Sequence, residues 1–294
     1  MCCKIQKRYI VLICVVFLLF LIGSFYDLEI SKLLYIGQYP NDNIFGIIFS
    51  YIGILPAFAG WSFLGAIILY LSKEESNKKR KTFLKGLSIF QYVLSFFFLC
   101  NTIMFTNLNV INVHWALAYG LGIIIFLLSM YGGYIFAKKS DNKYLLNKVV
   151  FISMISILTM FLAMGIKEIM LRPRYKLVLE LNDYNYFINW WENGRVLKDS
   201  IGESINSDFF KSFPSGHSAY AMFAIFIFPM LVDNKSKKYE SFLFICGVIW
   251  WILTAYSRLT IGAHYLTDVC FGGLITLISY VIITLILKKK IKSN

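Results

Sequence analysis

The stretch that ends at Asp268 contains residue types that could carry out nucleophilic chemistry. His264 precedes Asp268 by four residues, so on a helix the two side chains would lie one turn apart on the same face. A carboxylate in that place can accept the Nδ1–H of the imidazole, which leaves Nε2 unprotonated and able to attack an electrophile. The same spacing also suits a buried His–Asp pair with no catalytic role. The pair alone therefore does not distinguish a catalytic site from a structural contact.

A second stretch, Pro214 to His217, opens a hydrophobic run and has the composition of an anion-binding helix start. Pro214 can occupy the first helical position, where its missing N–H is no loss. The N–H groups of Ser215, Gly216 and His217 would then be free at the positive end of the helix dipole, which favours a phosphate-like anion. Gly216 would also let an anion approach the backbone closely. Ordinary helix capping explains the same residues, so both interpretations stand at this point.

Three basic residues could bind such an anion. Lys167 follows a long apolar run, and an ammonium near hydrocarbon is usually paired, functional or extended toward the membrane surface. Arg174 comes seven residues later, two turns along the same face if the helix continues, and Arg258 ends another apolar run. Arg172 and Lys176, on either side of Arg174, are expected to be ordinary anchors at the membrane surface.

The composition indicates that these residues are positioned by membrane-spanning helices. The chain is 58% hydrophobic and 18% aromatic but only 15% charged over its 294 residues. Runs near 20 apolar residues recur, and about 20 residues cross a hydrocarbon core of about 30 Å as a helix. The sequence therefore predicts an all-α integral membrane protein, a bundle of about eight transmembrane helices. The expected spans are residues 8–25, 52–72, 84–105, 114–137, 148–167, 216–232, 241–257 and 264–287.

The distribution of charge predicts the orientation of the bundle. The net charge is +13, and 20 of the 29 lysines and arginines, but only 5 of the 16 acidic residues, fall in segments 1–8, 73–85, 138–148, 233–240 and 288–294. The positive-inside rule then places these segments, with both termini, in the cytoplasm. Topology thus accounts for the basic excess, and nucleic-acid binding is not expected. The same orientation brings all three motif segments to the extracytoplasmic face.

We expect one membrane domain over residues 1–294. Residues 1–143 would supply N-terminal transmembrane helices outside the motifs, and residues 144–294 the catalytic core, with an extracytoplasmic loop at 175–213. Trp190 and Trp191 in this loop suit the headgroup layer, where they could help to admit a lipid; a soluble loop with its own aromatic cluster is the alternative. His114, the third histidine, is expected to be an anchor at the same face. A break at Gly53 and Pro56 is expected to separate a short helix from the span after it.

Together the three segments resemble the signature of the type 2 phosphatidic acid phosphatase superfamily of membrane lipid phosphatases. Its motifs are K-x(6)-R-P, P-S-G-H and S-R-x(5)-H-x(3)-D. Lys167 and Arg174 fit the first motif, except that Tyr175 replaces its final proline, and the other two motifs are complete at residues 214–217 and 257–268. The proline shapes the backbone and carries no chemistry, so we expect the replacement to affect local geometry more than activity.

The resemblance implies a reaction that needs neither a metal ion nor another cofactor. His264 would attack phosphorus through Nε2 to form a phosphohistidine, with Asp268 orienting and stabilising the ring. His217 would protonate the leaving oxygen and then activate the water that hydrolyses the intermediate. The implied phosphate-binding residues are Lys167, Arg174, Ser215, Gly216 and Arg258.

The function implied is a lipid phosphatase whose partners are a lipid phosphate and membrane lipids. Frequent Ile, Lys, Asn and Phe indicate an AT-rich genome, which favours a bacterial plasma membrane and envelope lipids. Undecaprenyl pyrophosphate, phosphatidylglycerophosphate and phosphatidic acid all present a phosphate at the headgroup level. A lipid phosphotransferase would use the same intermediate. A transporter with an anion site would need ionisable residues at mid-membrane, whereas here they cluster at one face.

Overall fold

The computed structural model describes residues 5–37, 42–111, 115–140, 144–201, 205–232 and 236–292. Within these ranges the chain forms helices and no β-strand, which confirms the all-α prediction. His114 lies outside the described residues, so its anchoring role stays a prediction.

Long helices occupy most of the apolar runs, and shorter helices and 3₁₀ turns lie between them. The α-helices are α1 (Lys7–Leu34), α2 (Ile44–Ile52), α3 (Leu55–Leu71), α4 (Lys78–Ile111), α5 (Trp115–Lys139), α6 (Leu145–Met170), α7 (Tyr175–Glu180), α8 (Arg195–Ile201), α9 (Gly216–Met222), α10 (Ala224–Met230), α11 (Glu240–Thr260) and α12 (Leu266–Lys292). Short 3₁₀ turns in the described chain are η1 (Ser72–Glu74), η2 (Tyr184–Tyr186), η3 (Ser207–Phe210) and η4 (Lys237–Tyr239).

In the described chain, seven helical stretches are long and apolar enough to cross a membrane. The span expected at 216–232 differs from these, because α9 and α10 divide it and together cover only Gly216–Met230. The prediction of about eight spans is thus matched by seven long stretches and one short apolar pair. The expected break near Gly53 is present, since α2 ends at Ile52 and α3 begins at Leu55.

The chain divides into two compact units. The first comprises residues 1–53, 156–222 and 250–294, and it holds every residue predicted for the active site. The second comprises residues 54–155 and 223–249. Helices α1 and α2 therefore fold with the motif-bearing segments, although they stand far from them in the sequence.

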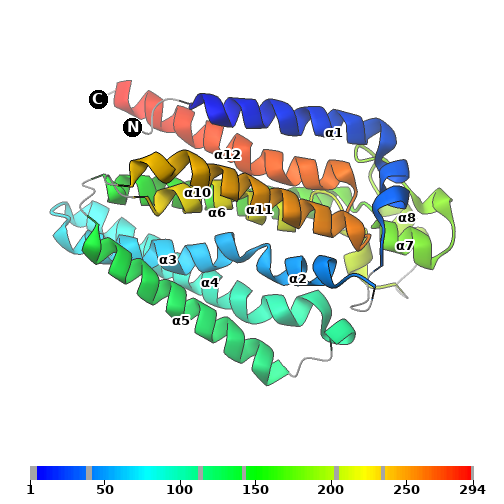
Figure 1. Ribbon diagram of the computed structural model, residues 1–294, viewed down its shortest axis with the longest axis horizontal. Helices are drawn as coiled ribbons and strands as arrows, with labels where there is room; N and C mark the ends of the chain where they lie inside the picture. Colours follow the sequence, from blue (N-terminus) through cyan, green and yellow to red (C-terminus); the bar gives the residue numbers. More distant parts are fainter. Residues whose placement is uncertain are drawn as a thin grey trace. The chain divides into compact units, whose positions relative to one another are not determined.

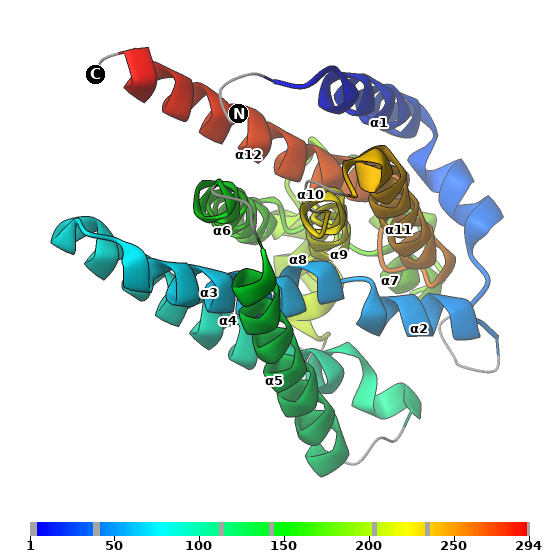
Figure 2. The ribbon, with the colours of Figure 1, turned by 60° about the vertical axis from the view of Figure 1, so that its left-hand side comes forward.

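In the first unit α1 lies antiparallel beside α12 (Figures 1 and 2). Tyr9 packs near Tyr280 with ring centroids 4.4 Å apart, and Phe20 packs near Phe271 at 5.7 Å. The buried residues of α1 recur every three or four positions, which defines one face: Tyr9, Leu12, Val16, Phe20, Gly23, Asp27 and Ser31.

The opposite face of α1 is apolar as well. Val11, Leu18 and Phe25 expose 61%, 58% and 79% of their surfaces. A helix that is apolar all round belongs in a protein core or in a membrane, and this one is exposed on one side. The exposed face therefore suits contact with lipid.

Also in the first unit, α9 packs on α12 through small residues (Figure 2). A Cβ atom on Gly272 would lie 2.3 Å from the carbonyl oxygen of Ser215, so only glycine permits this approach of the two backbones. The Ser215 N–H donates to the Asp268 carbonyl at 2.9 Å, and the Ser218 hydroxyl donates to the Val269 carbonyl. These bonds join the second and third motifs.

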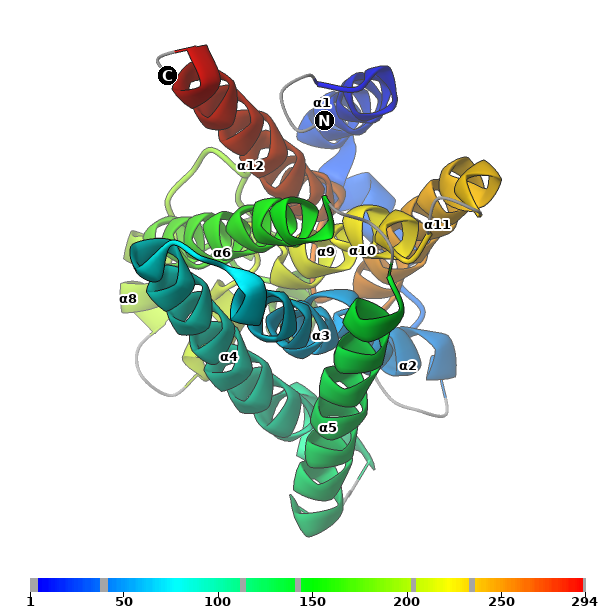
Figure 3. The same cartoon turned by 90° about the vertical axis from the view of Figure 1, so that its left-hand side faces the viewer.

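In the second unit α3, α4 and α5 pack against one another (Figure 3). A Cβ atom on Gly133 would lie 2.2 Å from the Phe63 carbonyl oxygen, and one on Gly122 would lie 2.6 Å from that of Leu99. Backbones that approach this closely at glycine are typical of helices packed in membranes.

Candidate active site

The first motif is divided between the end of one helix and the start of another. Helix α6 ends at Met170, and Leu171 turns the chain with a positive φ of 50°. Arg174 therefore does not continue the helix of Lys167; it is extended, with φ −79° and ψ 152°, and precedes α7. Tyr175 occupies the first position of α7, which proline would also accept, so this departure from the motif is compatible with the backbone found here.

His264 lies in the turn before α12 and is 1% exposed. Its Nδ1 lies 2.7 Å from the carbonyl oxygen of Ser212. A carbonyl oxygen can only accept, so Nδ1 carries the proton and Nε2 has a free lone pair. Asp268 Oδ2 lies 3.7 Å from Nδ1, beyond hydrogen-bond distance but close enough to stabilise a positive charge on the ring.

This arrangement differs from the expectation that Asp268 accepts the Nδ1–H directly. Because α12 begins at Leu266, His264 and Asp268 do not lie on one helix. Asp268 Oδ2 instead accepts the Ser212 hydroxyl and the Tyr265 N–H, the latter at 2.8 Å. The carboxylate thus fixes Ser212, whose carbonyl orients the imidazole. Ser212 is a site residue that the motifs do not mark.

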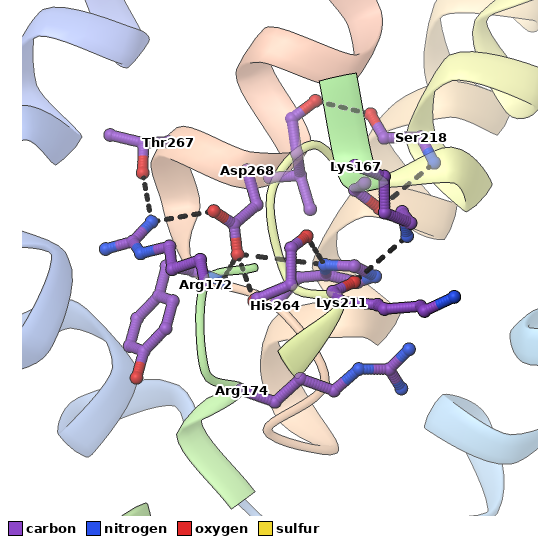
Figure 4. A network of polar contacts seen from close by, with 12 residues as sticks. Lys167, Arg172, Arg174, Lys211, Ser218, His264, Thr267 and Asp268 are labelled. Atoms are coloured by element: carbon purple, nitrogen blue, oxygen red, sulfur yellow. Dashed lines mark hydrogen bonds and ion pairs between the residues drawn. The ribbon is translucent and has the colours of Figure 1, made fainter. Parts of the chain in front are cut away.

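Arg172 belongs to a buried polar network, in which it contacts Thr267 and Asp268 (Figure 4). It is 0% exposed, and its NH1 donates to Asp268 Oδ1 at 2.6 Å and to Thr267 Oγ1 at 2.9 Å. Its NH2 donates to Asp27 Oδ2 at 3.0 Å, and its Nε donates to the Ile188 carbonyl at 3.0 Å. The prediction that Arg172 anchors the membrane surface is wrong, because two carboxylates compensate its charge inside the protein. Lys176, expected to be a similar anchor, is half-buried.

Asp27 comes from α1, outside the three motifs, and was not predicted. Its Oδ1 accepts the Thr267 N–H at 2.9 Å, while its Oδ2 accepts the Thr267 hydroxyl and Arg172. The carboxylate therefore also accepts a free N–H group at the N-terminus of α12, where the helix dipole favours a negative charge. The sequence does indicate that Asp27 is buried, because it follows Phe20 and Gly23 at the spacing of the buried face of α1. A buried charge in such a helix requires a partner.

The second motif differs in detail from the expected helix start. Helix α9 begins at Gly216, so Pro214 lies before the cap and not in the first turn. The Ser215 N–H is not free, because the backbone carbonyl of Asp268 accepts it, and the Ser215 hydroxyl accepts the Ser218 N–H at 3.4 Å. The predicted anion site at this helix therefore depends on the N–H groups of Gly216 and His217.

His217 and Arg258 both contact Ser50 of α2. The Nε2 atom of His217 lies 3.1 Å from the Ser50 carbonyl oxygen, so this nitrogen carries the proton. Arg258 NH1 donates to the Ser50 hydroxyl. Nothing in the sequence marks Ser50, because it lies in an apolar run without charged residues.

The guanidinium groups of Arg174 and Arg258 keep donors available. Arg174 NH2 lies 3.0 Å from both carboxylate oxygens of Asp208, and Lys167 Nζ donates to the Lys211 carbonyl at 3.0 Å. The Nε atoms of both arginines are buried and have no hydrogen-bond partner within the described residues. Buried donors without partners are uncommon, and at a site of this charge they suit phosphate oxygens.

The electrostatic environment keeps His264 neutral. Burial lowers the pKa of His264 to about 3, and the charges of Lys167 and Arg174 lower it further, although Asp268 opposes them. A neutral imidazole with a free Nε2, near cations with open donors, can attack phosphorus while those donors stabilise the oxygens. No cluster of three or more His, Cys, Asp or Glu side chains suited to a metal ion occurs within the described ranges.

The two tryptophans of the 175–213 loop have different surroundings. Trp190 donates its Nε1–H to the Ser24 hydroxyl at 2.9 Å, and its ring lies 4.8 Å from that of Phe20 and 5.8 Å from that of Phe213. Trp191 leaves 54% of its surface exposed. Trp190 thus holds the loop on α1, and only Trp191 presents a large free surface.

We predict opposite neutral tautomers for His264 and His217 in the ligand-free protein. Nitrogen-15 NMR of histidine-labelled protein should show Nδ1–H for His264 and Nε2–H for His217, with signals assigned in single-substitution variants. His264 should stay neutral from pH 8 to pH 5. Since the unfolded chain binds this proton near pH 6.5 and the folded chain near pH 3, stability should fall as pH drops through that window. Protonation of His264 near pH 6.5 would contradict the assignment.

We predict that Arg172→Gln destabilises the protein by about 3–5 kcal/mol, because two buried carboxylates lose their cation. Denaturant unfolding in detergent measures this loss. Adding Asp27→Asn should restore part of it, since one uncompensated charge is then removed. Arg195→Gln, at an exposed position, is the matched control and should leave stability unchanged. Equal stability of Arg172→Gln and the parent protein would show that the network is dispensable.

Comparisons with known proteins agree with the motifs. Residues 147–292 match the model of the PAP2 superfamily. Phosphatidylglycerophosphatase B of Haemophilus influenzae is 27% identical over 176 residues, which cover 53% of this chain and 71% of that protein. No solved structure matches the chain significantly.

The matched region begins at the start of α6 and contains all three motifs. Through residues 147–292 the chain belongs to the PAP2 superfamily, the type 2 phosphatidic acid phosphatases.

Proposed function

We propose that this protein is a membrane lipid phosphatase that works through a phosphohistidine at His264. The observation that carries the proposal is the hydrogen bond from Nδ1 to the Ser212 carbonyl, because it leaves Nε2 as a free nucleophile. The buried, unpaired Nε groups of Arg174 and Arg258 support it, since they suit the oxygens of a phosphate. Lys167 and the Gly216 N–H would complete the phosphate site, with Ser215 fixing the backbone.

In the first step the Nε2 lone pair of His264 forms a bond to phosphorus, and the bond from phosphorus to the lipid oxygen breaks. The positive charge on the phosphorylated ring is stabilised by Asp268, 3.7 Å away. His217 donates a proton to the leaving oxygen. Because its Nε2–H is held by the Ser50 carbonyl, we assign this transfer to Nδ1. The neutral ring of the ligand-free protein would take up a proton at Nδ1 when the anionic substrate binds, so His217 is doubly protonated before the step and neutral after it.

In the second step Nδ1 of the neutral His217 removes a proton from water. The water oxygen bonds to phosphorus as the bond to His264 Nε2 breaks, which releases phosphate and restores both histidines. The Ser50 carbonyl serves both steps, because it orients the ring and accepts from the imidazolium form. This chemistry requires only residues of the chain.

The substrate we propose is a lipid that presents its phosphate at the extracytoplasmic headgroup level. The relative named phosphatidylglycerophosphatase B favours phosphatidylglycerophosphate, and undecaprenyl pyrophosphate and phosphatidic acid offer the same phosphate chemistry. The orientation follows from the positive-inside pattern, with both termini cytoplasmic. Exposed Trp191 would contact headgroups beside the site.

We predict phosphate release from a panel of these lipid phosphates by the purified protein in excess chelator. His264→Ala should lose nearly all activity, whereas His114→Ala, outside the three motifs, should retain it. Thin-layer analysis of the lipid product with and without an acceptor alcohol separates hydrolysis from phosphotransfer. Full activity of His264→Ala, or strict dependence on an added divalent ion, would overturn the mechanism.

A further inference from the structure

Asp208 is an acidic residue beside the cations of the proposed phosphate site. It lies in η3, three residues before Lys211, and its side chain is 56% exposed. Both carboxylate oxygens lie 3.0 Å from Arg174 NH2. The mechanism above assigns no role to this carboxylate, although its partner is a proposed phosphate ligand.

The charges that act on the Asp208 carboxylate come from the residues of the proposed phosphate site. Partial burial alone would raise the pKa of Asp208, but Arg174, Lys176 and Lys167 outweigh this effect and hold the pKa below its ordinary value, with a smaller contribution from His264. Asp208 therefore lies within electrostatic reach of the proposed nucleophile and of two proposed phosphate-binding cations. A bound phosphate would need the same surroundings.

The backbone next to Asp208 is fixed to the first motif. The Arg174 N–H donates to the Phe209 carbonyl at 2.8 Å, and Lys167 Nζ donates to the Lys211 carbonyl at 3.0 Å. Segment 208–211 thus engages both basic residues of that motif. Because the backbone is held, an exposed carboxylate can move from Arg174 by side-chain rotation alone, without opening the site.

We infer that Asp208 is a resident anion of the phosphate site, which the substrate phosphate displaces from Arg174 and which returns as phosphate leaves. The inference rests on the proposed function. Asp208 would then lower the affinity for phosphate, because phosphate can bind Arg174 only by replacing the ion pair between Arg174 and Asp208. Weaker retention of free phosphate, the product, follows from this competition.

The test compares Asp208→Asn with Glu168→Gln in detergent-solubilised protein. Glu168 pairs with Lys211 Nζ at 2.6 Å, so its substitution removes the same charge close by without touching Arg174. Inorganic phosphate and vanadate are the inhibitors, and lipid phosphate is the substrate. We expect Asp208→Asn to lower both inhibition constants and the KM about three- to fivefold, as for a partly exposed ion pair, with Glu168→Gln unchanged. Asp208→Glu should resemble the parent protein.

Each other outcome has a distinct meaning. Weaker inhibition by phosphate in Asp208→Asn would overturn the inference, because Asp208 would then position Arg174 and not compete with the ligand. Unchanged inhibition constants would overturn it as well, and so would equal shifts in both variants. Failure of the parent protein to release phosphate from any lipid, together with no vanadate binding, would instead overturn the proposed function. Thermal unfolding of each variant verifies that the fold is intact.

Discussion

The pairing of Arg172 with Asp268 and Asp27 is the interaction on which the site depends. The guanidinium and the Asp268 carboxylate are fully buried, and the Asp27 side chain is 4% exposed. Removing such charges from water is costly, so each one must be placed accurately against its partners. The network joins α1, the segment after α6 and the start of α12. It thereby fixes Asp268, which in turn holds Ser212, and the Ser212 carbonyl orients His264, the proposed nucleophile.

This dependence explains why two helices outside the family match, α1 and α2, contribute to the site. Asp27 lies in α1, and Ser50 lies in α2, yet both are folded with the motif-bearing segments. Asp27 shares Arg172 with Asp268, and Ser50 contacts Arg258 and the proposed acid His217. The N-terminal helices therefore supply polar contacts as well as apolar surface. Removal of either contact would leave a proposed catalytic group less firmly positioned.

Much of this arrangement could be predicted from the sequence, because the chemistry is carried by residue types at short spacings. Long apolar runs predict the helices, and the three motifs predict a common site for His264, His217, Lys167 and Arg174, all of which lie in the first unit. The sequence does not predict the burial of Arg172, because its partners Asp27 and Asp268 are distant in the sequence and no local pattern links them. The sequence also predicts a direct contact of Asp268 with His264 Nδ1 that is absent. Two residues four positions apart share a helix face only if the helix includes both, and α12 begins after His264. Ser50 and Ser212 act through backbone carbonyls, which any residue type could provide, so only the fold identifies them.

The central claim is that His264 carries the phosphoryl group through Nε2. Rapid quenching of the enzyme with a lipid labelled in its phosphate, followed by proteolysis at alkaline pH and mass spectrometry, tests it directly. We predict a labelled peptide that contains His264, with the phosphoryl group on Nε2, that disappears when the label is chased with unlabelled lipid. A phosphorylated His217, or phosphate release with no labelled protein in the transient phase, would contradict the account.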